Sequence, residues 1–149
     1  MQIDDQLTIR EFSRGERMKR LVLGVLLFTV SLFAEVENIS VTPEFFKKNI
    51  PVIDVRTPGE WQQTGIVKGA YTIMFFDERG KYDIKAFLKA LNQAIDTKKP
   101  FALICHTGSR TTMISKFLDQ ELDYHVINLV GGMDVLMGQG YQPAPYSGE

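Results

Sequence analysis

The sequence predicts an α/β fold, with a mostly parallel central sheet flanked by helices on both faces. Short apolar runs typical of buried strands alternate with segments whose apolar residues recur every three or four positions, as in helices. Such alternation produces parallel strands, because each helix carries the chain back to the starting edge of the sheet. The chain has 149 residues, 44% of them apolar and 23% charged, which suits one domain with a core of its own.

Five apolar runs are the expected strands, at residues 39–41, 51–55, 70–76, 101–104 and 126–129. The helices are expected between and after them. Thr42 followed by Pro43 is typical of a helix start, and residues 60–64 are expected to form a further turn of helix. Gly131 and Gly132 precede a last short helix that is expected to end near residue 138 or 140.

Two longer helices have recognisable core sides. Asp83 is expected to cap a helix whose apolar residues share one face: Ile84, Phe87, Leu88, Leu91 and Ile95. The helix at 110–122 is expected to bury Met113, Ile114, Phe117 and Leu118. The tail at residues 143–149 is expected to be loose.

Residues 1–34 are expected to be an N-terminal extension and signal sequence. Five basic residues precede an uncharged run at 21–34, which is short for a membrane span and ends on Ala34 before Glu35. Cleavage after Ala34 would leave residues 35–149 as one periplasmic domain without stable membrane association. Two alternatives are a membrane anchor formed by residues 21–34 and a buried core helix.

Composition excludes several kinds of function. A formal net charge of −1 gives no indication of nucleic-acid binding. A single cysteine excludes an internal disulfide and a paired-cysteine redox motif. The two histidines, His106 and His125, lack the spacing of metal ligands, so neither a metal nor another cofactor is expected.

Cys105, the only cysteine, is the strongest candidate for a functional residue. It ends the apolar run at 101–104 and precedes a polar stretch: His106, Thr107, Gly108, Ser109 and Arg110. This order places the sulfur at the carboxyl end of a strand and before a helix N-terminus, where backbone N–H groups hold anions and favour a thiolate. The alternative is a buried structural cysteine, but such residues usually have apolar neighbours.

A second charged cluster follows another expected strand. Asp54 and Arg56 come at the end of the run at 51–55, and Glu60 lies a few residues further on. We expect Asp54 and Arg56 to form an ion pair, with Glu60 as a further member, that fastens the next loop and supports the site.

Four segments together resemble the rhodanese-like family of sulfurtransferases. They are Ile53-Asp-Val-Arg-Thr-Pro-Gly-Glu-Trp61, Gly65-Ile-Val-Lys-Gly-Ala70, Cys105-His-Thr-Gly-Ser-Arg110 and Asn128-Leu-Val-Gly-Gly-Met-Asp-Val-Leu136. They occur in the family's order and span about residues 50–142. Ile66 stands where the family usually has His, and Leu136 where it usually has Trp. Both are expected to be packing positions.

The resemblance implies a sulfur-transfer mechanism. Cys105 would take a sulfane sulfur from thiosulfate or a persulfide and pass it to a thiophilic acceptor such as cyanide or a thiol. Backbone N–H groups of His106 to Arg110 would cradle the sulfur, and Arg110 would pair with an oxyanion of the donor. Gly108 would let the loop curve, Thr107 and Ser109 would donate hydroxyl hydrogen bonds, and His106 would either touch substrate or face solvent.

Two other functions remain open from the sequence. One is a cysteine-dependent phosphatase or arsenate reductase, but these enzymes need five residues between cysteine and arginine, and this chain has four. The other is a non-catalytic sulfur carrier or binding module, which an intact cysteine loop does not exclude.

Overall fold

The computed structural model describes residues 36–148, and the signal sequence expected at 1–34 lies outside this part of the chain. Its five-stranded sheet has the order β1-β5-β4-β2-β3, and all four strand pairings are parallel. The predicted parallel sheet is therefore confirmed. The strands are β1 (Glu37–Ser40), β2 (Val52–Asp54), β3 (Tyr71–Thr72), β4 (Phe101–Ile104) and β5 (Val126–Val130).

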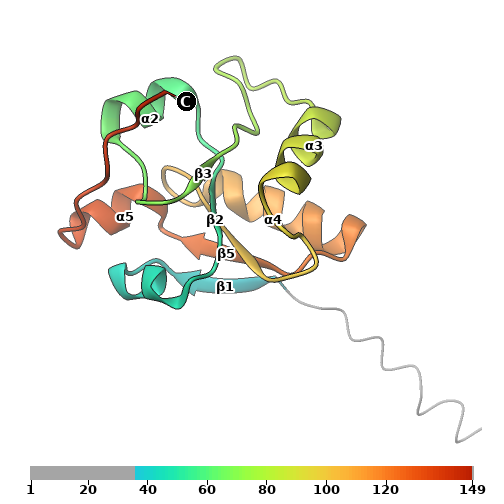
Figure 1. Ribbon diagram of the computed structural model, residues 1–149, viewed down its shortest axis with the longest axis horizontal. Coiled ribbons are helices and arrows are strands. Elements are labelled where there is room, and N and C mark those ends of the chain that lie inside the picture. Colours follow the sequence, from blue (N-terminus) through green and yellow to red (C-terminus); the bar gives the residue numbers. More distant parts are fainter. Residues whose placement is uncertain (1–35, 149) are drawn as a thin grey trace, which may run out of the picture. The chain divides into compact units, whose positions relative to one another are not determined.

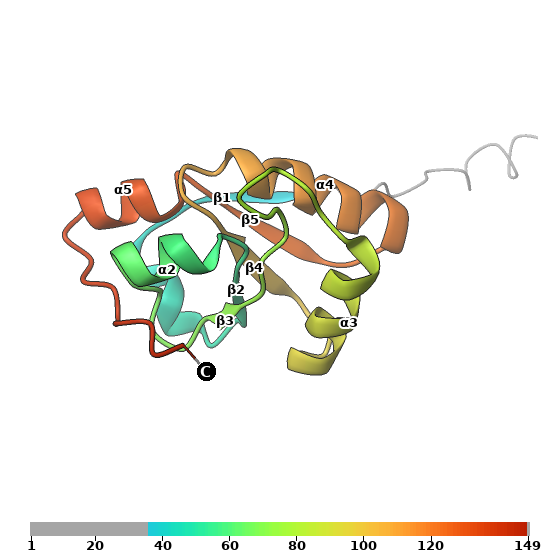
Figure 2. The same cartoon turned by 90° about the horizontal axis from the view of Figure 1, so that it is seen from above.

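Helices lie on both faces of this sheet, as expected. Figure 1 shows α3 and α4 on the right of the view and α5 on the left, and Figure 2 shows the same elements from above. The helical elements are the 3₁₀ helix η1 (Pro43–Lys48), α2 (Pro58–Thr64), α3 (Ile84–Ala94), α4 (Ser109–Leu122) and α5 (Gly132–Gly138). None of them is long and apolar enough to cross a membrane.

Each face of the sheet has its own apolar core, because alternate residues of a strand point to opposite sides. Phe101 and Leu103 of β4 pack with residues of α3 and α4, whereas Ala102 and Ile104 pack with residues of η1 and α5. Asp83 caps α3 as predicted, since its side chain accepts the N–H of Ala86 at 3.0 Å. The helices thus hold β4, and the residue that follows it, between two packed layers.

The third strand is shorter than the expected 70–76. After Thr72 the chain leaves the sheet and uses its apolar residues for packing. Phe75 is buried in the core on the α3 side, and its ring lies 4.8 Å from that of Phe87 and 5.6 Å from that of Tyr82 (centroid distances). The apolar run at 70–76 therefore includes residues that pack in the core, but only Tyr71 and Thr72 form strand.

The predicted core side of α4 is wrong at one residue. Met113 is 61% exposed, whereas Ile114 and Leu118 are fully buried. Thr111 shares their face at three- and seven-residue spacing and is also fully buried. The inner face of α4 therefore begins with a hydroxyl side chain close to Cys105.

The prediction of a loose C-terminal tail is also wrong for its first part. Ile66 and Ala144 exchange two backbone hydrogen bonds, at 2.9 and 2.8 Å, in an antiparallel bridge. The ring of Tyr146 lies 5.3 Å from that of buried Trp61 on α2. Leu136 is fully buried in the core and is a packing position, as expected. Ile66 is half-buried and pairs through its backbone instead.

Candidate active site

The candidate site lies where the carboxyl ends of neighbouring strands meet. Cys105 follows β4, and Asp54 ends β2 on one side of it. On the other side β5 ends at Val130 and is followed by Gly131 and Gly132. This edge of the sheet therefore gathers three of the four segments singled out from the sequence.

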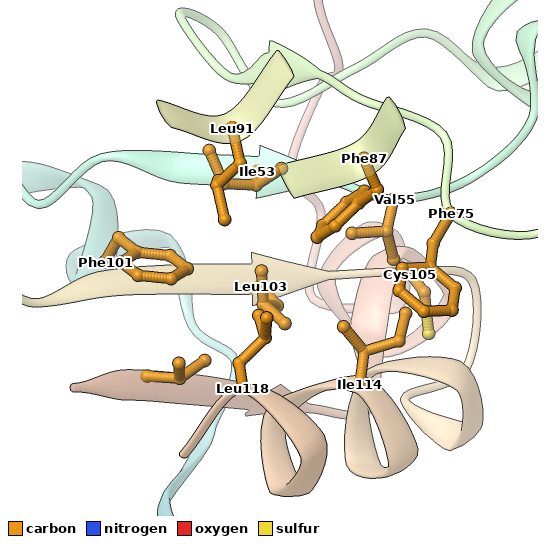
Figure 3. Close-up of a cluster of buried hydrophobic side chains, with 11 residues drawn as sticks. Ile53, Val55, Phe75, Phe87, Leu91, Phe101, Leu103, Cys105, Ile114 and Leu118 are labelled. Atoms are coloured by element: carbon orange, nitrogen blue, oxygen red, sulfur yellow. The ribbon is translucent and has the colours of Figure 1, made fainter. Parts of the chain in front are cut away.

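Cys105 is fully buried and lies at the end of the core cluster that is farthest from Phe101 (Figure 3). Its Sγ accepts the backbone N–H of Gly108 at 3.2 Å and lies 3.7 Å from the hydroxyl oxygen of Thr111. The sulfur thus has apolar neighbours on the core side and hydrogen-bonding groups on the loop side. Such surroundings suit a sulfur anion that is shielded from bulk water.

The predicted cradle of N–H groups is present in part. The N–H of Gly108 bonds the sulfur, and the first-turn amides of Ser109, Arg110 and Thr111 make no hydrogen bond within residues 36–148. The first N–H groups of a helix have no partner inside it and are suited to bind anions. These amides are therefore available to a second sulfur atom or to an oxyanion beside Cys105.

The loop is held by the start of α5, a feature that the sequence did not predict. Met133 donates its N–H to the carbonyl oxygen of Cys105 at 2.9 Å, and Asp134 donates to that of His106 at 3.0 Å. Gly132 permits this approach, since a Cβ there would lie 2.5 Å from the Cys105 carbonyl oxygen. The start of α5 thus takes up the carbonyls of Cys105 and His106, while the Gly108 N–H is bonded to the sulfur.

Thr111 is the residue of the site that sequence reasoning missed. Its hydroxyl donates to the carbonyl oxygen of Gly108 at 3.0 Å and lies near Cys105 Sγ. Gly108 has φ +95°, in the left-handed region where glycine is favoured. The available signal was the spacing of Thr111 with Ile114 and Leu118, which places a hydroxyl on the buried face.

Arg110 makes a bidentate ion pair with Glu60 of α2. Its Nη1 lies 2.8 Å from Oε2 and its Nη2 lies 2.6 Å from Oε1. The predicted grouping of Glu60 with Asp54 and Arg56 is therefore wrong. The guanidinium that the resemblance assigned to a donor oxyanion has a carboxylate of the protein as its partner.

This ion pair changes the pKa of both groups. Burial alone would raise the pKa of Glu60, but hydrogen bonds from Arg110 and from the Thr57 backbone lower it from 4.5 to about 2. The hydrogen bond to Glu60 raises the pKa of Arg110. Because the carboxyl has the lower pKa in the folded protein, the pair stabilises the fold above pH 4.5, and this contribution is lost as the pH falls toward 2.

Asp54 and Arg56 form the predicted ion pair, and both side chains are buried, at 0% and 1% exposure. Arg56 Nη2 lies 2.7 Å from Asp54 Oδ2. Arg56 also donates to the Thr64 hydroxyl at 2.6 Å and to the Gly65 carbonyl at 2.7 Å. The pair therefore fixes the end of α2 against β2, and α2 in turn presents Glu60 to Arg110.

The remaining predicted site residues lie on the rim. His106 is 53% exposed, and its Nδ1 lies 3.9 Å from Glu60 Oε1. Thr107 and Ser109 are exposed, and their hydroxyl oxygens lie 3.3 Å apart. Within residues 36–148, no group of three or more His, Cys, Asp or Glu side chains could hold a metal ion.

The model of the rhodanese-like domain family matches residues 42–138. No curated protein sequence matches the chain.

Solved structures that are similar to this chain come from several organisms. A rhodanese-related protein from Thermoplasma volcanium is 23% identical, with a TM-score of 0.51, covering 68% of this chain and 93% of that one. A protein from M. tuberculosis is 19% identical, with a TM-score of 0.54, covering 66% and 80%. A protein of unknown function from Rhodopseudomonas palustris, described as a possible tyrosine phosphatase, is 17% identical, with a TM-score of 0.49, covering 73% and 85%. At these identities, the likeness to the first two structures concerns the fold alone.

Proposed function

The chain belongs to the rhodanese-like domain family, and on that premise we propose that it is a sulfurtransferase that works through Cys105. The observation that carries the proposal is the hydrogen bond from the Gly108 N–H to Cys105 Sγ, beside first-turn amides of α4 that have no partner in the described part of the chain. The donor would be a small sulfur-containing anion or a persulfide. The acceptor would be cyanide or a thiol.

The proposed reaction has two steps. The Cys105 thiolate attacks the sulfane sulfur of the donor, so that a new S–S bond forms and the donor's own bond to that sulfur breaks. With thiosulfate the products are the Cys105 persulfide anion and sulfite. The acceptor then attacks the outer sulfur, leaving the Cys105 thiolate and, with cyanide, thiocyanate.

The site supplies what each step requires. The thiolate and the outer persulfide sulfur are anions, and N–H groups fixed by a loop stabilise them without having to reorient. The carbonyl oxygens of Cys105 and His106 accept hydrogen bonds from backbone N–H groups of α5. These oxygens therefore do not point toward the sulfur. Burial against the core limits the access of water to the reactive sulfur.

Loop size favours sulfur over phosphate chemistry. Four residues separate Cys105 from Arg110, and the loop closes tightly enough for the Gly108 N–H to reach the sulfur at 3.2 Å. Such a ring suits a single sulfur atom better than a tetrahedral oxyanion. A non-catalytic carrier would load sulfur in the same ring without turning over.

We expect the purified protein to produce thiocyanate from cyanide and a sulfane-sulfur donor over many turnovers, and not to hydrolyse an aryl phosphate. Both rates are measured on one preparation by absorbance. One equivalent of thiocyanate without further turnover would indicate a carrier. Phosphate release that depends on Cys105 would contradict the proposal.

Export is proposed from the sequence alone. Cleavage after Ala34 would release a periplasmic domain that begins at Glu35. N-terminal sequencing of the protein from a periplasmic extract of its host is expected to begin there. A full-length membrane-bound protein would instead support the anchor at residues 21–34.

A further inference from the structure

The charges at the mouth of the site bear on which sulfur donor it accepts. Arg110 is the arginine of the active loop, and both of its terminal nitrogens are hydrogen-bonded to the Glu60 carboxylate. The side chains of this pair are about one quarter exposed, at 24% and 26%. The positive charge of the Arg110 guanidinium is thus already neutralised by the protein.

Glu60 is held in place independently of Arg110. Its Oε2 accepts the Thr57 backbone N–H at 3.0 Å and the Thr57 hydroxyl at 3.2 Å. The bond from the Thr57 N–H is one half of a capping box, and in the other half the Glu60 N–H donates to the Thr57 hydroxyl oxygen at 3.4 Å. The box fixes the carboxylate at the N-terminus of α2. With a pKa of about 2, Glu60 is ionised at any working pH. An anionic donor therefore meets a fixed carboxylate that does not become neutral.

The charges around the sulfur add up to a negative value. With Cys105 as the thiolate, Arg110 contributes one positive charge, and Glu60 and the sulfur each contribute one negative charge. His106 is the other basic side chain of the loop, and its Nδ1 also lies closest to Glu60, at 3.9 Å from Oε1. A donor with two negative charges is repelled more strongly than a donor with one or none, and partial burial weakens the screening by water.

We propose that Glu60, by neutralising Arg110, makes this site selective for sulfane-sulfur donors of low charge over the thiosulfate dianion. The favoured class is a sulfane sulfur attached to an organic group, as in organic thiosulfonates and hydropersulfides. With a hydropersulfide, the Cys105 thiolate attacks the outer sulfur, the S–S bond of the donor breaks, and a thiolate leaves with the bonding electrons. The proton stays on the transferred sulfur. This inference rests on the proposed sulfurtransferase function.

Two donors of similar shape separate charge from size. Thiosulfate carries two negative charges, whereas methanethiosulfonate has a methyl group in place of one charged oxygen and carries one. Their leaving groups are sulfite and methanesulfinate, so their intrinsic reactivities differ. The informative quantity is therefore how the ratio of the two kcat/KM values changes between wild type and Glu60→Gln, with cyanide as acceptor.

Gln suits position 60 because its amide oxygen can still accept from Thr57, as the capping box allows either residue. Glu60→Gln is expected to raise the kcat/KM for thiosulfate relative to methanethiosulfonate about tenfold, mainly through KM. The matched control is Glu121→Gln, which makes the same charge change at the far end of α4. By the helical rise, Glu121 lies roughly 18 Å from the first residue of that helix. The control is expected to leave the ratio unchanged.

The outcomes are distinguishable. If Glu60→Gln lowers both values in the same proportion, Glu60 acts only as a structural residue and the selectivity proposal is refuted. The same holds if the ratio is unchanged. If neither donor yields thiocyanate with wild-type protein, the proposed function itself fails. A ratio that rises at high ionic strength in wild type, where salt screens the repulsion of the dianion, but changes little in Glu60→Gln would support the charge argument.

Discussion

Replacement of Cys105 by Ser is expected to reduce sulfur transfer by roughly 1,000-fold or more, because a hydroxyl does not provide an anionic nucleophile near neutral pH. The site around the residue changes little. The Gly108 N–H, which lies 3.2 Å from Sγ, remains available as a donor to a serine Oγ. Thiocyanate formation with saturating donor and cyanide measures the loss.

The fold of this variant needs its own control, because Cys105 is fully buried. A thermal melt is expected to show a midpoint close to that of the wild type, since the new hydroxyl can accept the Gly108 N–H. Cys105→Ala, which removes that hydrogen bond, is expected to be equally inactive. A folded Cys105→Ser variant that kept its turnover would show that another group carries the sulfur.

Asp54→Asn is expected to cost the fold about 3–5 kcal/mol, the usual result of removing one member of a buried ion pair. The Arg56 guanidinium, 1% exposed, would keep its bonds to Thr64 and Gly65 but lose the opposing charge. A loss of this size is a large part of the stability of an ordinary domain. Urea unfolding followed by circular dichroism measures it.

Asp96→Asn is the matched control for Asp54→Asn. Asp96 also pairs with a cation, Lys99, but at 3.7 Å and with its side chain 52% exposed. Exposed pairs contribute no more than about 1 kcal/mol. If both variants lost the same free energy of unfolding, burial would not make the Asp54–Arg56 pair more stabilising than the exposed pair.

Local patterns predicted the elements of this fold well. The apolar run that ends at Ile104 and the Asp83 cap are both read from a few neighbouring residues, and both are in the structure. The position of Cys105 at a strand end follows in the same way. The segment after Thr72 was mistaken for strand because its apolar residues do not reveal whether they pair or only pack.

Contacts between distant segments could not be predicted from such patterns. The sequence placed Glu60 near Arg56, four positions away, whereas its partner is Arg110, fifty positions away. That pairing depends on how α2 is set against α4, which the strand order decides. The hydrogen bonds from Met133 and Asp134 to the loop also join segments that lie far apart in the sequence. So do the hydrogen bonds between Ala144 and Ile66.

The central claim is that Cys105 carries the transferred sulfur. The most direct test uses a donor labelled at its sulfane sulfur, followed by removal of free donor, mass analysis of the Cys105 peptide, and then addition of cyanide. The claim predicts one labelled sulfur atom on Cys105, which cyanide removes while an equal amount of labelled thiocyanate forms. Labelled thiocyanate without label on Cys105, or a label on Cys105 that cyanide cannot remove, would contradict it.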